Sequence, residues 1–174
     1  MRKRTLSASL STYRKKRKFT RTPEPSGKKS STGPHTIFVV QKHDASHLHY
    51  DVRLQMEGIL RSWAVPKGPP TKIGDKRLAV PTEDHPLEYA HFSGTIPEGE
   101  YGAGTVQIWD HGTYHSIKKK DGKLLSPAQA YHEGHLEVWF DGKRLKGPYA
   151  LIKTHLRDDK DWLFIKMKRR AGME

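Results

Sequence analysis

The chain has 174 residues, a length that suits one domain with a tail and that can bury a core without cross-links. Its 32 Lys and Arg residues outnumber 19 Asp and Glu residues, and the resulting formal net charge of +13 favours a polyanionic partner such as nucleic acid. The chain has no cysteine, which excludes disulfides, cysteine-based zinc modules and a thiol nucleophile.

Residues 1–34 are rich in Lys, Arg, Ser, Thr, Pro and Gly, which predicts a basic, largely flexible N-terminal arm. Leu10 and Tyr13 could mark one helical turn, and the basic run 14–18 could then follow a phosphate backbone. A solvated tail without a fixed partner is the alternative. The chain has neither a signal-peptide core nor an apolar run that could span a bilayer, so we expect a cytoplasmic, nucleoid-associated protein and no membrane partner.

From residue 36 onward, β-branched and aromatic runs recur at spacings of about 8 to 12 residues, with turn residues between them. Strands are expected over 36–41, 47–55, 59–65, 78–81, 104–109, 112–116, 136–140, 149–154 and 162–167, and a short helix over 126–132. Hairpin turns are expected at 56–58, 110–112 and 141–142. We therefore predict an all-β domain over 35–170, a compact antiparallel barrel of about eight strands with short flanking helices, or a sandwich, followed by a tail over 171–174.

The strand expected over 47–55 has two unlike faces, because side chains alternate along a strand. One face carries His47, His49, Asp51 and Arg53. The other face carries Leu48, Tyr50, Val52 and Leu54, and is apolar enough to lie against a core. Imidazole nitrogen and carboxylate oxygen suit a divalent transition metal, to which His43 could add a nitrogen, and Arg53 could bind a phosphate. A half-exposed strand that happens to be rich in histidine is the alternative.

Other polar residues stand in turns. Lys67 lies between prolines and a glycine, and Pro86 keeps His85 in an extended or turn segment suited to proton transfer or phosphate contact. The alternative is a plain surface turn for Lys67 and a structural role for His85. The glycine-rich stretch 97–104 is not a phosphate-binding loop of the Walker type and predicts a tight turn. The stretch 119–122 matches the Lys-x-Asp-Gly pattern of covalent nucleotidyltransferases, but the chain is too short for such a domain, so it predicts a hairpin or loop.

Several longer motifs occur in the order in which one family carries them: FVVQKHDA from Phe38, LHYDVRL from Leu48, SWAVPKGP from Ser62, KRLAV from Lys76, EDHPLEY from Glu83 and GEYGAG from Gly99. This series closely resembles the 3'-phosphoesterase domain of bacterial DNA ligase D, which also occurs as a free-standing protein in archaea and bacteria. The resemblance is dense over about 17–116 and looser through 141–147 and 161–166.

The resemblance implies a manganese-dependent enzyme that removes a 3'-terminal ribonucleoside and then hydrolyses the remaining 3'-phosphate to a 3'-hydroxyl. The residues that match the family's metal ligands are His43, His49 and Asp51. Zn²⁺ and Co²⁺ also suit this ligand set. Those that match its phosphate contacts are Gln41, Arg53, Lys67, Arg77 and His85, and Tyr89 matches a residue near the reacting centre. Arg53, Lys67 and Arg77 would offset transition-state charge, and His85 would stabilise the transition state or protonate the leaving oxygen.

The family's N-terminal arm also enters the site, and Arg17 and Glu24 match its residues. Lys18 stands where the family has an acidic residue, a departure that bears on the ribonuclease step. The position of His47 varies in the family, so we expect His47 to lie outside the metal site.

The implied partners are the 3' ends of DNA or RNA-tailed DNA primer-templates, together with a separate DNA ligase and polymerase, and we expect a monomer. Two other functions remain open. The first is a non-catalytic, basic nucleic-acid-binding module in which the histidine face is a relic or a structural zinc site. The second is a phosphodiesterase that acts on RNA ends or 2',3'-cyclic phosphates.

Overall fold

The computed structural model describes residues 9–27, 36–155 and 159–174. Its helices and strands, in chain order, are α2 (Ser11–Lys15), β1 (Ile37–Asp44), β2 (Leu48–Met56), β3 (Ile59–Val65), β4 (Lys76–His85), the 3₁₀ helix η1 (Leu87–His91), β5 (Gly94–Ile96), β6 (Gly104–Ser116), β7 (Lys119–Lys120), β8 (Lys123–Leu124), α3 (Pro127–His132), β9 (His135–Gly142), β10 (Lys146–Lys153) and β11 (Trp162–Lys166). None of the helices in these ranges is both long and apolar enough to cross a membrane.

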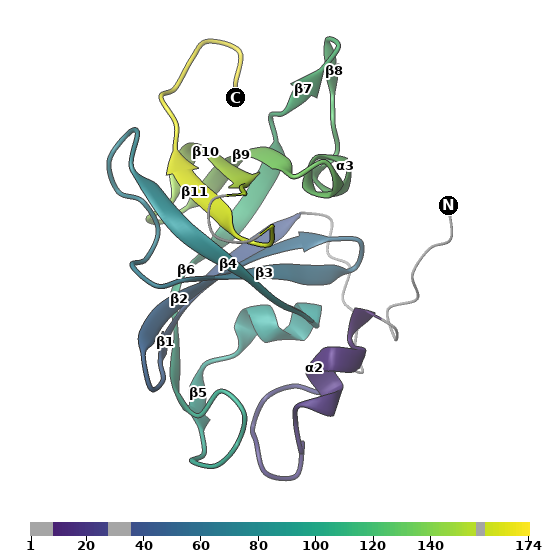
Figure 1. Cartoon of the computed structure of the whole chain (residues 1–174), viewed down its shortest axis with the longest axis vertical. Coiled ribbons are helices and arrows are strands. Elements are labelled where there is room, and N and C mark those ends of the chain that lie inside the picture. The colour runs from purple at the N-terminus through teal and green to yellow at the C-terminus, as the bar shows by residue number, and fades with distance from the viewer. Residues whose placement is uncertain (1–8, 28–35, 156–158) are drawn as a thin grey trace.

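The main sheet is a closed antiparallel barrel (Figure 1). Its strands follow the order β1-β2-β3-β4-β11-β10-β9-β6, and pairing of β1 with β6 closes the ring. The short strand β5 pairs with β6 outside the ring. The predicted barrel of about eight strands with minor helices is therefore confirmed.

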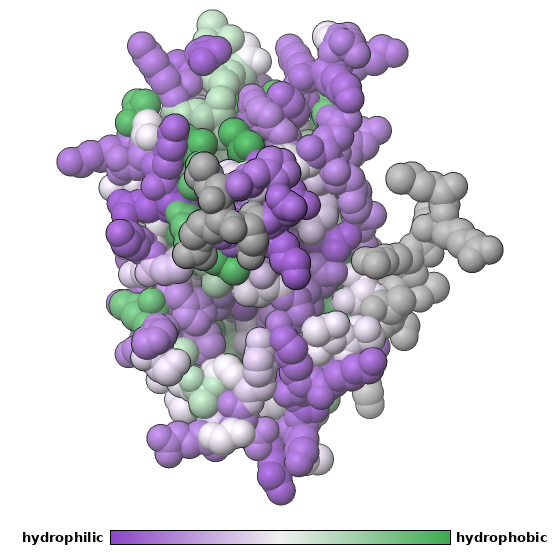
Figure 2. Space-filling model, viewed as in Figure 1, coloured by the Kyte–Doolittle hydropathy of each residue, from purple (hydrophilic) through white to green (hydrophobic). Residues whose placement is uncertain are grey.

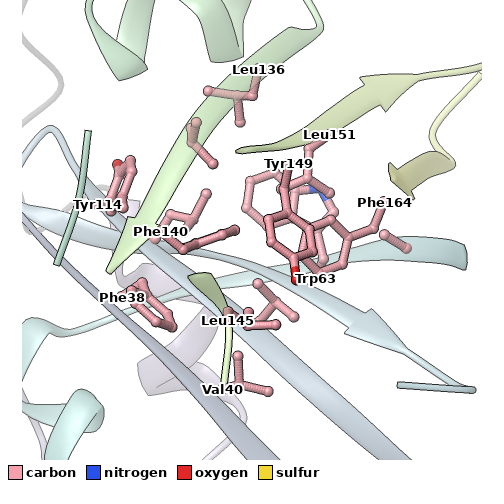
Figure 3. Packing of buried hydrophobic residues seen from close by; sticks show 14 of the residues in the cluster. Phe38, Val40, Trp63, Tyr114, Leu136, Phe140, Leu145, Tyr149, Leu151 and Phe164 are labelled. Carbon is pink, nitrogen blue, oxygen red and sulfur yellow. The ribbon is translucent and has the colours of Figure 1, made fainter. Parts of the chain in front are cut away.

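The barrel interior is filled by apolar side chains that alternate with outward-facing residues along each strand. Phe38 lies edge-on to Phe140 with ring centroids 4.7 Å apart, and Tyr149 and Phe164 surround the same ring at 5.3 and 6.2 Å (Figure 3). All four side chains are buried. This packing makes the wall rigid, because each aromatic ring is enclosed by rings from other strands.

A second apolar cluster lies on the outer face of the barrel. It combines strand residues with residues from α2, η1 and β5, and its members are Tyr13, Val39, Leu60, Leu87, Tyr89, Ala90, Phe92, Ile96 and Val106. The segments that carry it lie beside the barrel wall rather than across its ends (Figure 1). One outward face of β1, β3 and β6 is thus covered, and polar groups beside this cluster are shielded from water.

The described part of the N-terminal arm, residues 9–27, is docked on this cluster. Leu10 and Tyr13 are buried, as the expected helical turn requires, and the Tyr13 hydroxyl donates a hydrogen bond to the Pro25 carbonyl. Arg14 donates to the Ser26 carbonyl at 3.3 Å. These contacts fold the arm back on itself against the barrel. Residues 1–8 and 28–34 of the expected arm lie outside the described residues.

Strand β6 differs from the expectation of two strands joined by a turn at 110–112. It is continuous over Gly104–Ser116, and Val40 and Gln41 of β1 pair with Asp110 and Ile108, so Trp109 is the extra residue of a β-bulge. A Cβ on Gly112 would lie 2.2 Å from the Asp141 carbonyl oxygen. The Asp-His-Gly sequence therefore serves a bulge and a close strand approach, which also favour glycine, and not a turn.

The turn expected at 141–142 lies slightly later, because Asp141 and Gly142 still belong to β9 and the chain turns at 143–145 before β10. Three other local predictions agree with the structure. Helix α3 begins after Ser126, which forms a capping box with Gln129. The hairpin between β2 and β3 turns at Glu57 and Gly58, both with positive φ, and the Lys-Lys-Asp-Gly stretch forms the hairpin of β7 and β8. In the face shown in Figure 2, hydrophilic side chains predominate, as the composition indicates.

The Asp110 carboxylate ties the β9–β10 connection to the bulge. It is 2 % exposed and accepts hydrogen bonds from the backbone N–H groups of His111, Lys143, Arg144 and Leu145 at 2.8 to 3.0 Å. One carboxylate therefore satisfies donors from the β6 bulge and from the β9–β10 connection.

We expect Asp110→Ala to lower the free energy of unfolding by about 3 kcal/mol, because several backbone donors lose their acceptor where water has little access. Urea denaturation measures the change. The matched control is Asp141→Ala, which removes the same charge from an exposed position nearby and should cost less than about 0.5 kcal/mol. Equal effects of the two substitutions would contradict a special role for Asp110.

Candidate active site

Three alternate pairs of the β1–β2 ladder build the site. His43 lies opposite His49, Gln41 opposite Asp51, and Val39 opposite Arg53. Residues directly opposite each other in an antiparallel pair share a face, so the polar side chains stand together on the outer face of the barrel. The apolar residues Val52 and Leu54 point into the interior core, as the alternating sequence of this strand predicts.

His43, His49 and Asp51 converge on one point. The carboxylate oxygen Oδ2 of Asp51 lies 3.5 Å from Nδ1 of His43 and 3.2 Å from Nε2 of His49. One ligand atom from each residue lies within 4.8 Å of the others. Two imidazoles and a carboxylate in this arrangement can hold a divalent transition metal, with room for further ligands on the open side.

The remaining ring nitrogen of each histidine meets a backbone carbonyl. Nε2 of His43 lies 2.8 Å from the Gly102 oxygen, and Nδ1 of His49 lies 3.0 Å from the His47 oxygen. A carbonyl can only accept a hydrogen bond, so these nitrogens carry the protons and the nitrogens facing Asp51 have free lone pairs in the neutral rings. This second layer of contacts orients metal-binding histidines and selects their tautomers.

Asp51 is charged in this setting. Burial alone would raise its pKa, but the Arg53 guanidinium and the hydrogen bonds that the His43 and His49 rings donate when protonated outweigh burial and hold the pKa of Asp51 well below its usual range. The hydrogen bond to Asp51 raises the pKa of His49, in spite of partial burial. A proton and a cation therefore compete for the space between His49 and Asp51.

Arg53 is held from two sides. Its Nη2 lies 3.5 Å from Asp51, and its Nε donates to the Gln41 side-chain oxygen at 2.7 Å. The amide nitrogen of Gln41 in turn donates to the carbonyls of Tyr89 and Phe92 at 2.7 and 3.0 Å. Gln41 is thus a buried brace for Arg53 that lies behind the pocket. Nη1 of Arg53 is buried and has no hydrogen-bond partner among the described residues, which makes it a donor available to an anion.

Arg17 and Glu24 bring the arm to the same place. Arg17 donates to Glu24 at 2.9 Å and to Glu83 of β4 at 3.1 Å. The Tyr89 hydroxyl donates to Glu24 at 2.7 Å. Burial raises the pKa of Tyr89, so this hydroxyl stays protonated and remains a donor. The face of the Tyr89 ring lies against Arg53, with the guanidinium carbon 4.8 Å from the ring centroid.

His85 ends β4 and is 3 % exposed, so the expected extended conformation before Pro86 is found. Its Nδ1 lies 2.8 Å from the Glu83 carbonyl and therefore carries the proton. Burial lowers the pKa of His85 well below its ordinary value, and the charges of Arg53 and Arg17 lower it further. The ring is thus neutral and offers a lone pair at Nε2, which fits hydrogen-bond acceptance better than the expected protonation of a leaving oxygen.

These side chains line a cavity of about 200 Å³ on the barrel wall. Of the residues expected from the sequence, the cavity lining includes Arg17, His43, His49, Asp51, Arg53, His85 and Tyr89. Glu24 and Gln41 lie behind this lining and hold Arg17 and Arg53 in place.

The structure does not bring Lys67 and Arg77 to the cavity lining. Lys67 is exposed in the turn that follows β3. Arg77 pairs with Phe164 of β11 on the side of β4 that faces the interior core, and its guanidinium lies 3.9 Å from Asp75. Lys18 and His47 are exposed and contribute no side chain to the lining.

Three contributors to the site were not assigned a role from the sequence. The Gly102 carbonyl orients His43, and Glu83 binds both Lys16 and Arg17 of the arm. Tyr101 stands at the rim of the cavity, 47 % exposed. Both Gly102 and Tyr101 lie in the glycine-rich stretch that predicts a turn. Their position beside the histidines depends on the pairing of β6 with β1 and of β5 with β6, which no local signal reveals.

The sequence matches the model of the family described as "DNA Ligase D 3'-phosphoesterase domain" over residues 41–153. This range contains both histidines and the aspartate of the candidate metal site, together with Arg53, His85 and Tyr89. The described arm residues 9–27 precede it.

The chain is also similar to proteins named multifunctional non-homologous end joining protein LigD. It is 49 % identical over 166 residues to the protein of Pseudomonas aeruginosa, covering 93 % of the chain and 19 % of that protein. It is 45 % identical over 164 residues to the protein of Mycolicibacterium smegmatis, covering 94 % of the chain and 21 % of that protein. The chain therefore spans about a fifth of the length of these curated relatives.

We expect Mn²⁺ to raise the thermal unfolding midpoint of the protein, because an ion that binds only the folded state stabilises it by about 2.7 kcal/mol at a hundredfold excess over its Kd. His49→Ala and Asp51→Ala should lose this rise, since each removes one of the converging ligands. Differential scanning fluorimetry with and without EDTA measures it. His115→Ala, an exposed histidine on β6, is the control that should keep it. Equal metal-induced rises in all variants would refute the site.

The neutral state of buried His85 has a consequence for stability. Its lowered pKa means that below about pH 6.5 the unfolded chain binds a proton that the folded chain does not, so the free energy of unfolding falls as pH falls. The slope for one such proton is at most about 1.4 kcal/mol per pH unit. We expect His85→Gln to have a shallower slope below pH 6.5 in urea titrations with EDTA, and the exposed control His115→Gln to keep the wild-type slope.

Proposed function

The chain belongs to the DNA ligase D 3'-phosphoesterase domain family, and we propose that it is a metal-dependent phosphoesterase that heals DNA 3' ends. Its reaction would remove a 3'-phosphate, or a 3'-terminal ribonucleoside and then the phosphate, to leave a 3'-hydroxyl. The observation that carries the proposal is the convergence of His43, His49 and Asp51 beside Arg53, whose Nη1 is a buried donor without a partner among the described residues.

The residues fit a bound divalent ion. Two oriented imidazoles and one ionised carboxylate would hold it, and Mn²⁺, Zn²⁺ and Co²⁺ all suit this donor set. When bound, such an ion polarises a phosphoryl oxygen and offsets the negative charge that develops during hydrolysis. The same oxygen of Asp51 faces both imidazoles and Arg53, so the residues that would hold the ion lie beside the guanidinium that would bind the phosphate.

The chain's own residues bind and orient the phosphate. Arg53 offers Nη1 as a charge-assisted donor, and Gln41 and Tyr89 prevent its guanidinium from turning away. Arg17 adds positive charge at the opposite rim, where two carboxylates fix it. His85 is placed to accept a proton from a water molecule or from the phosphate through Nε2, because its other nitrogen is committed to a carbonyl.

Lys18 bears on the ribonuclease step but not on phosphate removal. Its side chain is exposed and does not line the cavity, whereas its neighbour Arg17 does. Phosphate removal uses residues on the barrel wall and Arg17, so we propose that this step is retained. The ribonucleoside step is to be measured by itself, because the family's acidic residue is the one that Lys18 replaces.

The biological setting follows from the relatives, which are named as multifunctional end-joining proteins. We propose that this domain prepares 3' ends for other enzymes. A DNA polymerase extends only a 3'-hydroxyl end, and a DNA ligase seals only a 3'-hydroxyl end. The net charge of +13 favours binding along the phosphate backbone without selection of sequence.

We expect a 5'-labelled primer with a 3'-phosphate to be converted to a 3'-hydroxyl product in the presence of Mn²⁺, while His49→Ala and Asp51→Ala lose activity by at least about 100-fold. Denaturing gels resolve the products, and a panel with Zn²⁺ and Co²⁺ ranks the metals. A parallel primer with one 3'-terminal ribonucleotide tests the ribonuclease step. His115→Ala is the control for loss of a histidine outside the site and should keep full activity.

The alternatives give different results in the same assay. A non-catalytic binding module would bind the primer tightly, with strong salt dependence, and release no product with any metal. An enzyme specific for RNA ends would act on a 2',3'-cyclic phosphate and leave the DNA 3'-phosphate intact. Full activity of both metal-site variants would rule out the assignment of the ligands.

A further inference from the structure

Tyr101 is an exposed aromatic residue at the rim of the active-site cavity that the proposed chemistry does not use. It precedes Gly102, whose carbonyl orients His43, so its backbone is anchored to the metal site. Its side chain is 47 % exposed. Few large apolar side chains among the described residues are as exposed, and those others, such as Ile73, do not line the cavity. The position of Tyr101 therefore calls for a functional explanation.

The cavity is too small for the whole substrate. Its volume is about 200 Å³, below the range of roughly 300–1,000 Å³ that is typical of pockets for larger ligands, so it suits a phosphate and an ion. The nucleoside that carries the phosphate must then lie outside, at the rim. A second, more polar cavity of about 640 Å³ adjoins the first, and Thr82, Glu83 and Tyr101 line both. Tyr101 thus stands at the passage between the two cavities.

The ring of Tyr101 is held in place by its hydroxyl. Lys16 donates to this hydroxyl at 3.2 Å, and the hydroxyl lies 3.4 Å from the Glu83 carboxylate. The Lys16 ammonium also lies 4.6 Å from the ring centroid. The Arg17 guanidinium carbon lies 5.4 Å from the same centroid, so two cations flank the ring while Tyr101 stays 47 % exposed. A planar side chain held in this way loses little freedom when a second ring stacks on its exposed part.

We propose that Tyr101 is the platform on which the base of the 3'-terminal nucleotide stacks, and that the adjoining cavity receives the strand that leads to it. This inference rests on the proposed function and adds how the substrate is recognised. Stacking on an aromatic ring tolerates every base, as an enzyme acting on DNA ends of any sequence requires. Tyr101 would then position substrate and would take no part in the chemical step.

The test compares Tyr101→Ala with Tyr101→Phe on a DNA primer with a 3'-phosphate. We expect Tyr101→Ala to raise KM about tenfold with little change in kcat, and Tyr101→Phe to stay within about twofold of the wild type, because phenylalanine keeps the stacking face. A primer whose terminal nucleotide is abasic should lose the same factor with the wild type, and Tyr101→Ala should add no further loss. Ile73→Ala, which removes an exposed apolar side chain away from the cavity, is the control.

Two results would overturn the inference. If Tyr101→Phe were as impaired as Tyr101→Ala, the hydroxyl contacts to Lys16 and Glu83 would account for the residue. If the abasic primer were as sensitive to Tyr101→Ala as the normal primer, no base would stack there. Binding of the same primers in EDTA, measured by fluorescence anisotropy, separates this question from turnover. A wild-type protein without turnover would refute the proposed function, while the contrast in binding would still decide the role of Tyr101.

Discussion

The register between β1 and β2 is the constraint on which the site depends. It places His43 opposite His49 and Gln41 opposite Asp51, so that four polar side chains share one outward face. A slip of one residue would turn this face into the barrel and expose Val52 and Leu54 instead. The free energy of the interior core therefore also selects the arrangement of the candidate metal ligands, because both depend on the same alternation.

Charged groups on the outer wall of the barrel are shielded from water only where other residues cover them, and the second apolar cluster provides this cover. Tyr13 from the arm, Tyr89 from η1 and Ile96 from β5 close over polar groups that would otherwise face water. Reduced access of water strengthens the interaction between Asp51 and Arg53. The cost is that every charged group there needs a partner, which explains the chain of contacts from Gln41 to Arg53 and from Glu24 to Arg17.

The arm contacts the barrel at Glu83, so the site combines residues of the barrel with residues of the arm. Glu83 belongs to β4, yet it binds Lys16 and Arg17 of the arm and approaches Tyr101 of the glycine-rich turn. The candidate metal ligands stand on β1 and β2, with His43 oriented by the Gly102 carbonyl of the turn, whereas Arg17 is brought to the cavity by the docked arm. Changes in the arm can thus alter the Arg17 side of the cavity without contact to the candidate ligands, whereas changes in the turn reach His43 through the Gly102 carbonyl.

The sequence by itself determined the barrel class, most strand positions, the polar and apolar faces of β2 and, through its resemblance to a family, the residues of the candidate metal site. The strand positions and the two faces of β2 follow from local patterns such as alternation along one strand. The candidate metal ligands follow from motifs. Only the tertiary structure decided that β6 runs through its Asp-His-Gly segment, because a bulge and a turn use the same residues and differ in what the neighbouring strands provide. It also placed Arg77 toward the interior core, Gln41 behind Arg53 and Tyr101 at the rim, since these positions follow from pairing between strands that are distant in the chain.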